Sequence, residues 1–205
     1  MRWDRLFEDL EDQLASEWEA ERAALDSEAE RVRIARMTLR SRLSALVESP
    51  PRSADRVGVE VLCGDVLTGS LRAVGADFTA IRADDAVHGL VIAPLAAIAS
   101  VAVAPHALVR SARPRPHERA HLSERLTFGF VLRDVARRRL PVRVVSAQGR
   151  HQTGTIDRVA ADHLDLAVHD AGTPRRQREI TAVRIVPFAA IACVHLDADA
   201  APALV

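Results

Sequence analysis

One stretch of this chain repeats itself, and the repeat constrains the fold more than any other feature. Residues 57–81 align with residues 142–166 at a constant offset of 85, and eight of the 25 positions are identical. Residues 92–101 align with residues 185–194 at an offset of 93, with seven of ten positions identical. Roughly three matches would be expected by chance for this composition. The sequence therefore predicts two copies of one module, the second with an eight-residue insertion.

Each copy has the pattern of five short strands separated by turns. Gly69 and Gly154 interrupt the second strand of their copies, where glycine is typical of a sharp bend or bulge. Five bent antiparallel strands in about 50 residues protect their edges by curling into a small barrel. We therefore expect a mainly β protein with helices, containing two separate, closed five-stranded barrels. One continuous sheet through both copies would contradict this expectation.

The pattern around these glycines resembles the Sm-like fold of Lsm proteins and bacterial Hfq. Gly69 and Gly154 match the bend glycine of that family, and Asp77 and Asp162 match the aspartate of its following turn. The last strand of each copy also has the family's Ile-x-x-Val spacing. The resemblance covers about half of the chain and implies two Sm-like or SH3-like barrels, each preceded by a helix.

Two segments depart from that family. Residues 94–96 and 187–189 read Pro-Leu-Ala and Pro-Phe-Ala, where Hfq has a polar triplet that contacts uridine. The resemblance therefore implies the fold without the family's RNA pocket. The first 14 residues, MRWDRLFEDLEDQL, resemble a group of actinobacterial proteins, some labelled Fis-type regulators, although no helix-turn-helix supports that label here.

The N-terminal segment is predicted to be helical. Its first 48 residues contain no glycine or proline and are rich in Ala, Leu, Glu and Arg. The capping-box spacing of Ser27 and Glu30 favours a hinge, and hence a helical hairpin or a cross-paired dimer. The alternative is one amphipathic helix that lies on the first barrel. Apolar residues that recur every seven positions predict self-association through Trp18, Leu25, Val32 and Leu39.

Charge is strongly segregated, although the chain carries 28 basic and 28 acidic side chains. Residues 1–30 hold eleven acids and three arginines, whereas residues 106–151 hold eleven arginines and three acids. Every basic residue is arginine, which the codon bias of a GC-rich genome also explains. Arginine binds phosphate in a bidentate manner, so the basic block predicts contacts with RNA or DNA. The predicted contact residues are Arg110, Arg113, Arg115, Arg119, Arg137, Arg138, Arg139, Arg143, Arg175, Arg176 and Arg178.

These patterns predict five consecutive regions. Residues 1–50 form the helical segment, residues 51–104 the first barrel, and residues 105–121 a Pro- and Arg-rich linker. Residues 122–197 form a helix and the second barrel, and residues 198–205 form a tail. The chain has no apolar run that could span a membrane, no signal peptide, and too few cysteines for a disulfide scaffold. We therefore expect a cytoplasmic protein with no membrane contact.

Three functional hypotheses follow, and the third is a regulator or subunit of an enzyme. The sequence contains no phosphate-binding loop, nucleophile elbow or zinc-protease motif, so we expect no enzyme, no catalytic residue, no cofactor and no metal. The first hypothesis is a nucleic-acid-binding or regulatory accessory protein, related to RNA, built on tandem Sm-like barrels. The alternative is a protein–protein assembly module that binds no nucleic acid, with a homo-oligomer or another protein as its partner. Two barrels on one chain could also pair with each other or build an assembly of several chains.

Overall fold

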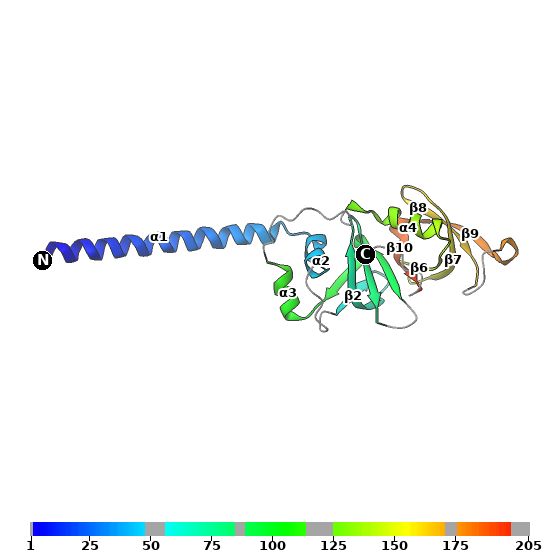
Figure 1. Ribbon diagram of the computed structural model, residues 1–205, viewed down its shortest axis with the longest axis horizontal. Helices are drawn as coiled ribbons and strands as arrows, with labels where there is room; N and C mark the ends of the chain where they lie inside the picture. Colours follow the sequence, from blue (N-terminus) through cyan, green and yellow to red (C-terminus); the bar gives the residue numbers. More distant parts are fainter. Residues whose placement is uncertain (1, 48–55, 85–88, 114–124, 171–175, 198–205) are drawn as a thin grey trace. The chain divides into compact units, whose positions relative to one another are not determined.

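The chain divides into two compact units, residues 1–38 and residues 39–205, which are described separately (Figure 1). One helix makes up the first unit, and β-strands dominate the second. The computed structural model describes residues 2–47, 56–84, 89–113, 125–170 and 176–197, with side chains from residue 13 onward except that of Gln177.

The first unit is a single long helix, α1 (Arg2–Ala35), followed by a turn at Arg36. The predicted hinge at Ser27 is therefore wrong, because the helix continues through that position to Ala35. Strong helix formers lie on both sides of Ser27, and Glu30 forms an ion pair with Arg33 at 2.5 Å. A capping box starts a new helix only where the backbone at its first residue is not helical. Ser27 lies inside α1, so the predicted hairpin does not form within α1.

The second unit contains three α-helices and ten strands within the described ranges. The helices are α2 (Leu39–Val47), α3 (Pro105–Ser111) and α4 (Phe128–Arg137). The strands of the first half are β1 (Val57–Val61), β2 (Val66–Val74), β3 (Phe78–Ala83), β4 (Leu90–Pro94) and β5 (Ile98–Ala102). Those of the second half are β6 (Pro141–Ser146), β7 (His151–Val159), β8 (His163–Val168), β9 (Ala182–Pro187) and β10 (Ile191–Leu196).

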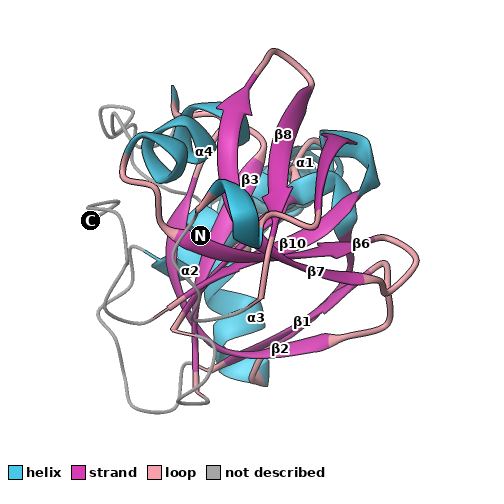
Figure 2. Ribbon diagram, turned by 90° about the vertical axis from the view of Figure 1, so that its right-hand side faces the viewer, coloured by secondary structure: helices cyan, strands magenta, loops and turns pink. Residues whose placement is uncertain are grey.

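All ten strands belong to one antiparallel sheet, in the order β5-β1-β2-β3-β4-β10-β6-β7-β8-β9. The two halves therefore have the same internal order and are joined where β4 pairs with β10. The prediction of two separate closed barrels is wrong, since this pairing takes the place of closure within each half. One shared ladder satisfies the backbone groups of two edges at once. Figure 2 shows how strongly the sheet bends, with β3 and β8 running across the direction of β6 and β7.

The pairing register is the same in both halves. Val57 pairs with Gly69 in the first half, and Val142 pairs with Gly154 in the second, at the offset of 85 found in the sequence. A bulge follows at equivalent positions of β2 and β7. A Cβ atom at either Gly69 or Gly154 would lie only 2.0 Å from a carbonyl oxygen of the next strand. Five strands per copy are present within the described residues, as predicted. The bulges lie after the two glycines, between Leu71 and Ala73 and between Ile156 and Arg158, and at Gly69 and Gly154 themselves the next strand approaches closely.

The segment predicted as a linker is partly helical. Pro105 occupies the first turn of α3, where its fixed φ and missing N–H suit a helix. Arg42 of α2 holds α3 by donating to the carbonyl oxygen of Leu108 at 3.2 Å and to the hydroxyl of Ser111 at 3.0 Å. The remainder of the predicted linker, residues 114–121, lies outside the described residues.

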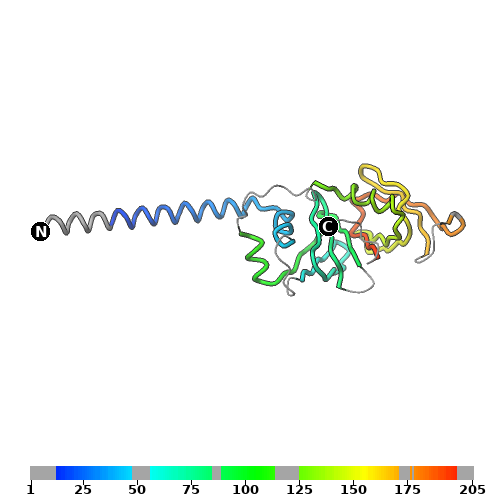
Figure 3. The backbone as a smooth tube through the Cα atoms, in the orientation of Figure 1, coloured from blue at the N-terminus to red at the C-terminus, as the bar shows by residue number. Residues whose placement is uncertain are grey.

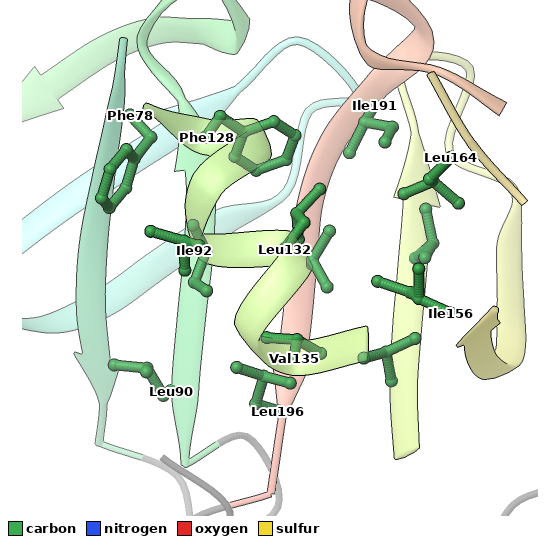
Figure 4. Packing of buried hydrophobic residues seen from close by; sticks show 14 of the residues in the cluster. Phe78, Leu90, Ile92, Phe128, Leu132, Val135, Ile156, Leu164, Ile191 and Leu196 are labelled. Carbon is green, nitrogen blue, oxygen red and sulfur yellow. The ribbon is translucent and has the colours of Figure 1, made fainter. Parts of the chain in front are cut away.

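Helix α4 packs against both halves of the sheet (Figure 4). Leu132 and Val135 of α4 are fully buried in one cluster with Leu90 and Ile92 of β4 and with Ile156 of β7. A second cluster of buried residues connects strands β1 to β4 with β6 and β10. The joint between the halves is therefore part of the protein's hydrophobic core. We call the β4–β10 ladder, together with α4, the internal joint.

The start of α4 depends on the first half. The backbone N–H of Phe128 donates to Oδ1 of Asp77 at 2.6 Å, and the N–H of Phe130 donates to Oγ1 of Thr127 at 3.3 Å. Side-chain oxygens at these positions satisfy N–H groups that have no partner within the helix, and the Asp77 carboxylate also complements the helix dipole. The turn aspartate of the first half thus caps the helix of the second half.

Candidate functional site

Helix α1, whose backbone Figure 3 traces, carries exposed residues that the sequence predicts for self-association. Trp18 and Leu25 are 65% and 64% exposed, and Val32 is 39% exposed. Side chains seven residues apart lie close to one face of a helix, and exposed Leu14 extends this stripe toward the N-terminus. A helix with an exposed apolar stripe is typical of a helix that packs on another helix. We call Leu14, Trp18, Leu25 and Val32 the α1 stripe.

Leu39 does not belong to the α1 stripe, which corrects the sequence prediction. The chain leaves α1 at Arg36, and Leu39 is the first residue of α2 in the second unit. A spacing of seven residues places side chains on one face only within a continuous helix. Because α1 ends between Val32 and Leu39, the spacing does not place these two residues on one face. Leu39 instead lines a groove of about 180 Å³ between α2, β5 and α3. We call this groove the β5 groove.

Three predicted arginines lie together at the end of α4. Arg137, Arg138 and Arg139 are all exposed, and the carboxylate of Asp134 pairs with Arg137 and Arg138. Arg139 has a φ of 53°, in the left-handed region that normally favours glycine at the end of a helix. A residue with a Cβ costs about 1 kcal/mol in this conformation. The chain therefore keeps an exposed arginine where glycine would be more stable.

The other predicted arginines are distributed over separate elements. Arg110 is half-buried in α3, Arg113 is exposed just after it, Arg143 is half-buried in β6, and Arg176 and Arg178 are exposed before β9. Arg115, Arg119 and Arg175 lie outside the described residues. Of the predicted arginines that the structure describes, three are consecutive at the end of α4, and the other five come from α3, the residues just after it, β6 and the segment before β9.

A cavity of about 420 Å³ lies between the two halves of the sheet. Its lining includes Asp65 and Asp84 from the first half and Arg143, His151 and His195 from the second half. Asp84 forms an ion pair with Arg56, and Asp65 and Arg143 line the same cavity, so this surface carries charges of both signs. Sequence reasoning missed this cavity because its lining residues come from both copies and share no short motif.

The cysteines are poorly suited to nucleophilic catalysis. Burial raises the pKa of Cys193 to about 12, so its thiol stays protonated at neutral pH, although His195 Nε2 lies 3.3 Å from its Sγ. Burial also raises the pKa of Cys63. A reactive cysteine needs the opposite shift, because the thiolate is the nucleophile.

The two end strands of the sheet differ from the internal joint in exposure. Within the described part of the chain, β9 pairs with β8 and β5 pairs with β1, and each leaves its other edge open. Val183 and Ile185 of β9 are 61% and 71% exposed, whereas their equivalents Leu90 and Ile92 in β4 are 6% and 0% exposed. An open edge presents N–H and C=O groups to another strand.

None of the helices described for this chain has the length and apolarity that a membrane span requires. Within the same residues, no three His, Cys, Asp or Glu side chains are placed to hold a metal ion. The surface features that stand out among the described residues are the α1 stripe, the arginines that end α4, and the open sheet edges. No family model matches the chain, and neither a curated protein nor a solved structure does.

Proposed function

We propose that the protein is a non-catalytic assembly module that self-associates through α1. The observation that carries this proposal is the exposure of Trp18, Leu25 and Val32 along one face of a 34-residue helix. Burying a large apolar side chain contributes about 1.5–3 kcal/mol. Helices in proteins gain most of their stability by packing an apolar face, and α1 is the one element within residues 2–38, the described part of the first unit. A second copy of α1 supplies that contact.

The charge of α1 favours an antiparallel pair. Residues 13–30 hold six acids and one arginine, whereas residues 31–36 hold three arginines and no acid. An antiparallel partner brings the acidic part of one helix beside the basic end of the other. A parallel partner would bring like charges together, which destabilises neighbouring helices.

The second unit fits the role of a scaffold. Its halves share one strand order and one register, which supports the inference that they are duplicated copies of an Sm-like module joined edge to edge. Neither half closes on itself, so this inference depends on strand order, register and the bend glycines rather than on closure. No nucleophile or metal cluster within the described residues points to catalysis.

Size-exclusion chromatography with light scattering tests the assembly function. We expect the full chain to form a multimer, and Trp18→Glu with Leu25→Glu to lower its mass. Ile34→Glu is the matched control, because Ile34 is an exposed apolar residue of α1 that lies off the stripe. A chain that is monomeric without substitution contradicts the proposal, as does a control that lowers the mass equally. Circular dichroism checks that α1 remains helical in each variant.

A second candidate function, RNA or DNA binding, is favoured by one observation. Arg139 retains a charged side chain at a backbone position where glycine is more stable, and Arg137 and Arg138 lie beside it. Anisotropy of labelled RNA and DNA at two salt concentrations tests this function. We expect the triple alanine variant of these arginines to weaken binding and flatten its salt dependence, and Arg31→Ala on α1 to change little. Unchanged binding in the triple variant rejects the candidate.

A further inference from the structure

The cavity of about 420 Å³ between the two halves is lined by polar side chains that the halves do not share. Its charged and imidazole residues are Asp65, Asp84, Arg143, His151 and His195. At the equivalent positions the other half has, in the same order, Arg150, His169, Gly58, Val66 and Ala102. The two halves nevertheless have the same strand register. The shared backbone arrangement therefore does not require these five side chains, and they need another explanation.

Two basic side chains lie next to each other on the wall that the second half contributes. Arg143 of β6 pairs directly with His195 of β10, whereas the same ladder position in the first half pairs Gly58 with Ala102. Opposed residues on neighbouring strands lie on the same face of the sheet, and both basic side chains are half-buried. Each also interacts with another group of the protein, but a guanidinium group has five N–H donors and can bind a second acceptor. This wall therefore suits the negatively charged group of a ligand.

The wall that the first half contributes carries the opposite charge. Asp65 is exposed in the β1–β2 turn, which is closed by a 3.0 Å hydrogen bond from the N–H of Val61 to the carbonyl oxygen of Asp65. Asp84 follows β3, and its carboxylate accepts from Nε of Arg56 at 2.8 Å. A carboxylate has about four acceptor sites, so this ion pair leaves Asp84 able to accept from a ligand as well. The first-half wall therefore suits a positively charged hydrogen-bond donor.

The second half uses the position equivalent to Asp84 in a different way. His169 stands there, is 4% exposed, and has its Nε2 atom 2.8 Å from Oγ1 of Thr155. The backbone is the same at both positions, since the N–H of each residue donates to the carbonyl oxygen of the equivalent threonine in the second strand. The second half thus fills the space with a buried, hydrogen-bonded side chain, whereas the first half keeps a carboxylate in the wall of a cavity.

We propose that this cavity binds a small aliphatic zwitterion, an amino acid with one ammonium and one carboxylate group. Arg143 binds the carboxylate, because a planar guanidinium group presents parallel N–H donors, and Asp65 accepts from the ammonium. The aliphatic part contacts the apolar lining, which is Val66, Leu67 and Ala83. A ligand with a single charge would complement only one of the two walls, and the volume of the cavity is within the usual range for small-molecule sites. The site lies within the second unit and does not depend on self-association through α1.

The first experiment titrates the full chain with unbranched amino acids of increasing length, from glycine to ε-aminocaproate, by isothermal titration calorimetry. Each is compared with the carboxylate that lacks its amine and with the amine that lacks its carboxylate, such as caproate and hexylamine. We expect at least one amino acid to bind saturably, and both of its single-charge analogues to bind about tenfold more weakly or worse. The proposal is overturned if no amino acid of the series binds, or if one of the single-charge analogues binds as tightly as the zwitterion.

The second experiment assigns the two charges of the ligand to the two walls. Arg143→Gln should lower the affinity for the best amino acid to that of its matched amine, and Asp65→Asn to that of its matched carboxylate. Arg158→Gln is the control, because Arg158 is an exposed arginine of β7 outside the cavity lining. Circular dichroism checks the fold, and Asp65→Asn changes an exposed turn residue, so it tests the site even if Arg143→Gln does not fold. Unchanged affinity in Asp65→Asn, or an equal loss in the control, contradicts the proposal.

Discussion

The two halves of the sheet share a backbone arrangement and differ in what covers their fourth strand. In the first half, β4 pairs with β10 and its outward side chains lie under α4. In the second half, β9 has the same position, and its equivalent side chains are exposed. The residues around them have changed as well, since an aromatic and two small apolar side chains became His163, Arg158 and Asp165.

This difference shows that different residues determine the pairing register of a strand and the burial of its open edge. The register follows from glycines and alternating valines, which both halves retain. Whether an edge is buried permanently follows from the side chains beside it, which the halves do not share. The same module thus serves as an interior element in one place and as a terminal element in another.

The largest expected difference in unfolding free energy is between substitutions at the buried Ile92 and at its exposed equivalent, Ile185. Ile92→Ala should lower the free energy of unfolding by about 2–5 kcal/mol, because it leaves a cavity in the core around α4. Ile185→Ala should change it by less than about 0.5 kcal/mol in a monomeric background. Urea denaturation followed by circular dichroism measures both values. Similar losses at the two positions would contradict the described burial.

The bend glycines test whether the halves are equivalent in their backbone. Alanine at Gly69 or Gly154 places a Cβ atom 2.0 Å from a carbonyl oxygen, so the neighbouring strand must shift. We expect each substitution to cost about 1–3 kcal/mol. Gly58→Ala is the control, since its Cβ would meet neighbours at 3.6 and 3.7 Å. Thermal unfolding compares the three variants, and tolerance in only one half would argue against a repeated module.

The alanine variants of the two turn aspartates, Asp77 and Asp162, should differ by a smaller amount in unfolding free energy. Asp77→Ala removes the carboxylate that accepts from the first N–H of α4 and should cost about 1 kcal/mol. Asp162→Ala removes an exposed side chain that caps no described helix and contacts His163 at the surface, so it should cost less than Asp77→Ala. Asp77→Asn retains an acceptor and should recover much of the loss. Equal costs for the two alanine variants would show that the cap is unimportant.

The smallest expected effect is a pKa shift at Asp162. The hydrogen bond with His163 lowers the pKa of the Asp162 carboxyl group. His163→Phe, which introduces the residue found at this position in the first half, should return that pKa toward its ordinary value. A lowered pKa favours folding above the ordinary pKa, and the benefit is lost as pH falls through the lowered value. NMR titration detects the change, and an unchanged pKa would exclude His163 as its cause.

Local features of the second unit were predictable from the sequence. The repeat identified the strands, and Gly69 and Gly154 identified positions where the next strand approaches closely, a little before a bulge, because both signals depend on residues close together in the chain. Pairing of the two barrels with each other was one open expectation, but no local pattern specified the joint, since Ile92 and Val194 are distant in sequence. The expectation of closure failed for that reason.

The candidate sites were predictable to a smaller extent. The spacing of Trp18, Leu25 and Val32 identified an exposed stripe, but it wrongly included Leu39, because the end of α1 has no glycine or proline to mark it. The arginine prediction came from composition, which cannot say whether residues gather on one surface. The β5 groove and the cavity at the joint depend on contacts between distant segments, so no local pattern identifies them.

The position of β10 has a consequence for synthesis. It is the last described strand, yet it pairs with β4 in the middle of the sheet. On the ribosome, the apolar side chains of β4 that face α4 stay uncovered until residues 128–137 have emerged, and the edge of β4 stays open until residues 191–196 have emerged. Long-range strand pairing of this kind is slow and exposes intermediates to aggregation. The growing chain is therefore most vulnerable after β4 has been made and before translation reaches its pairing partner.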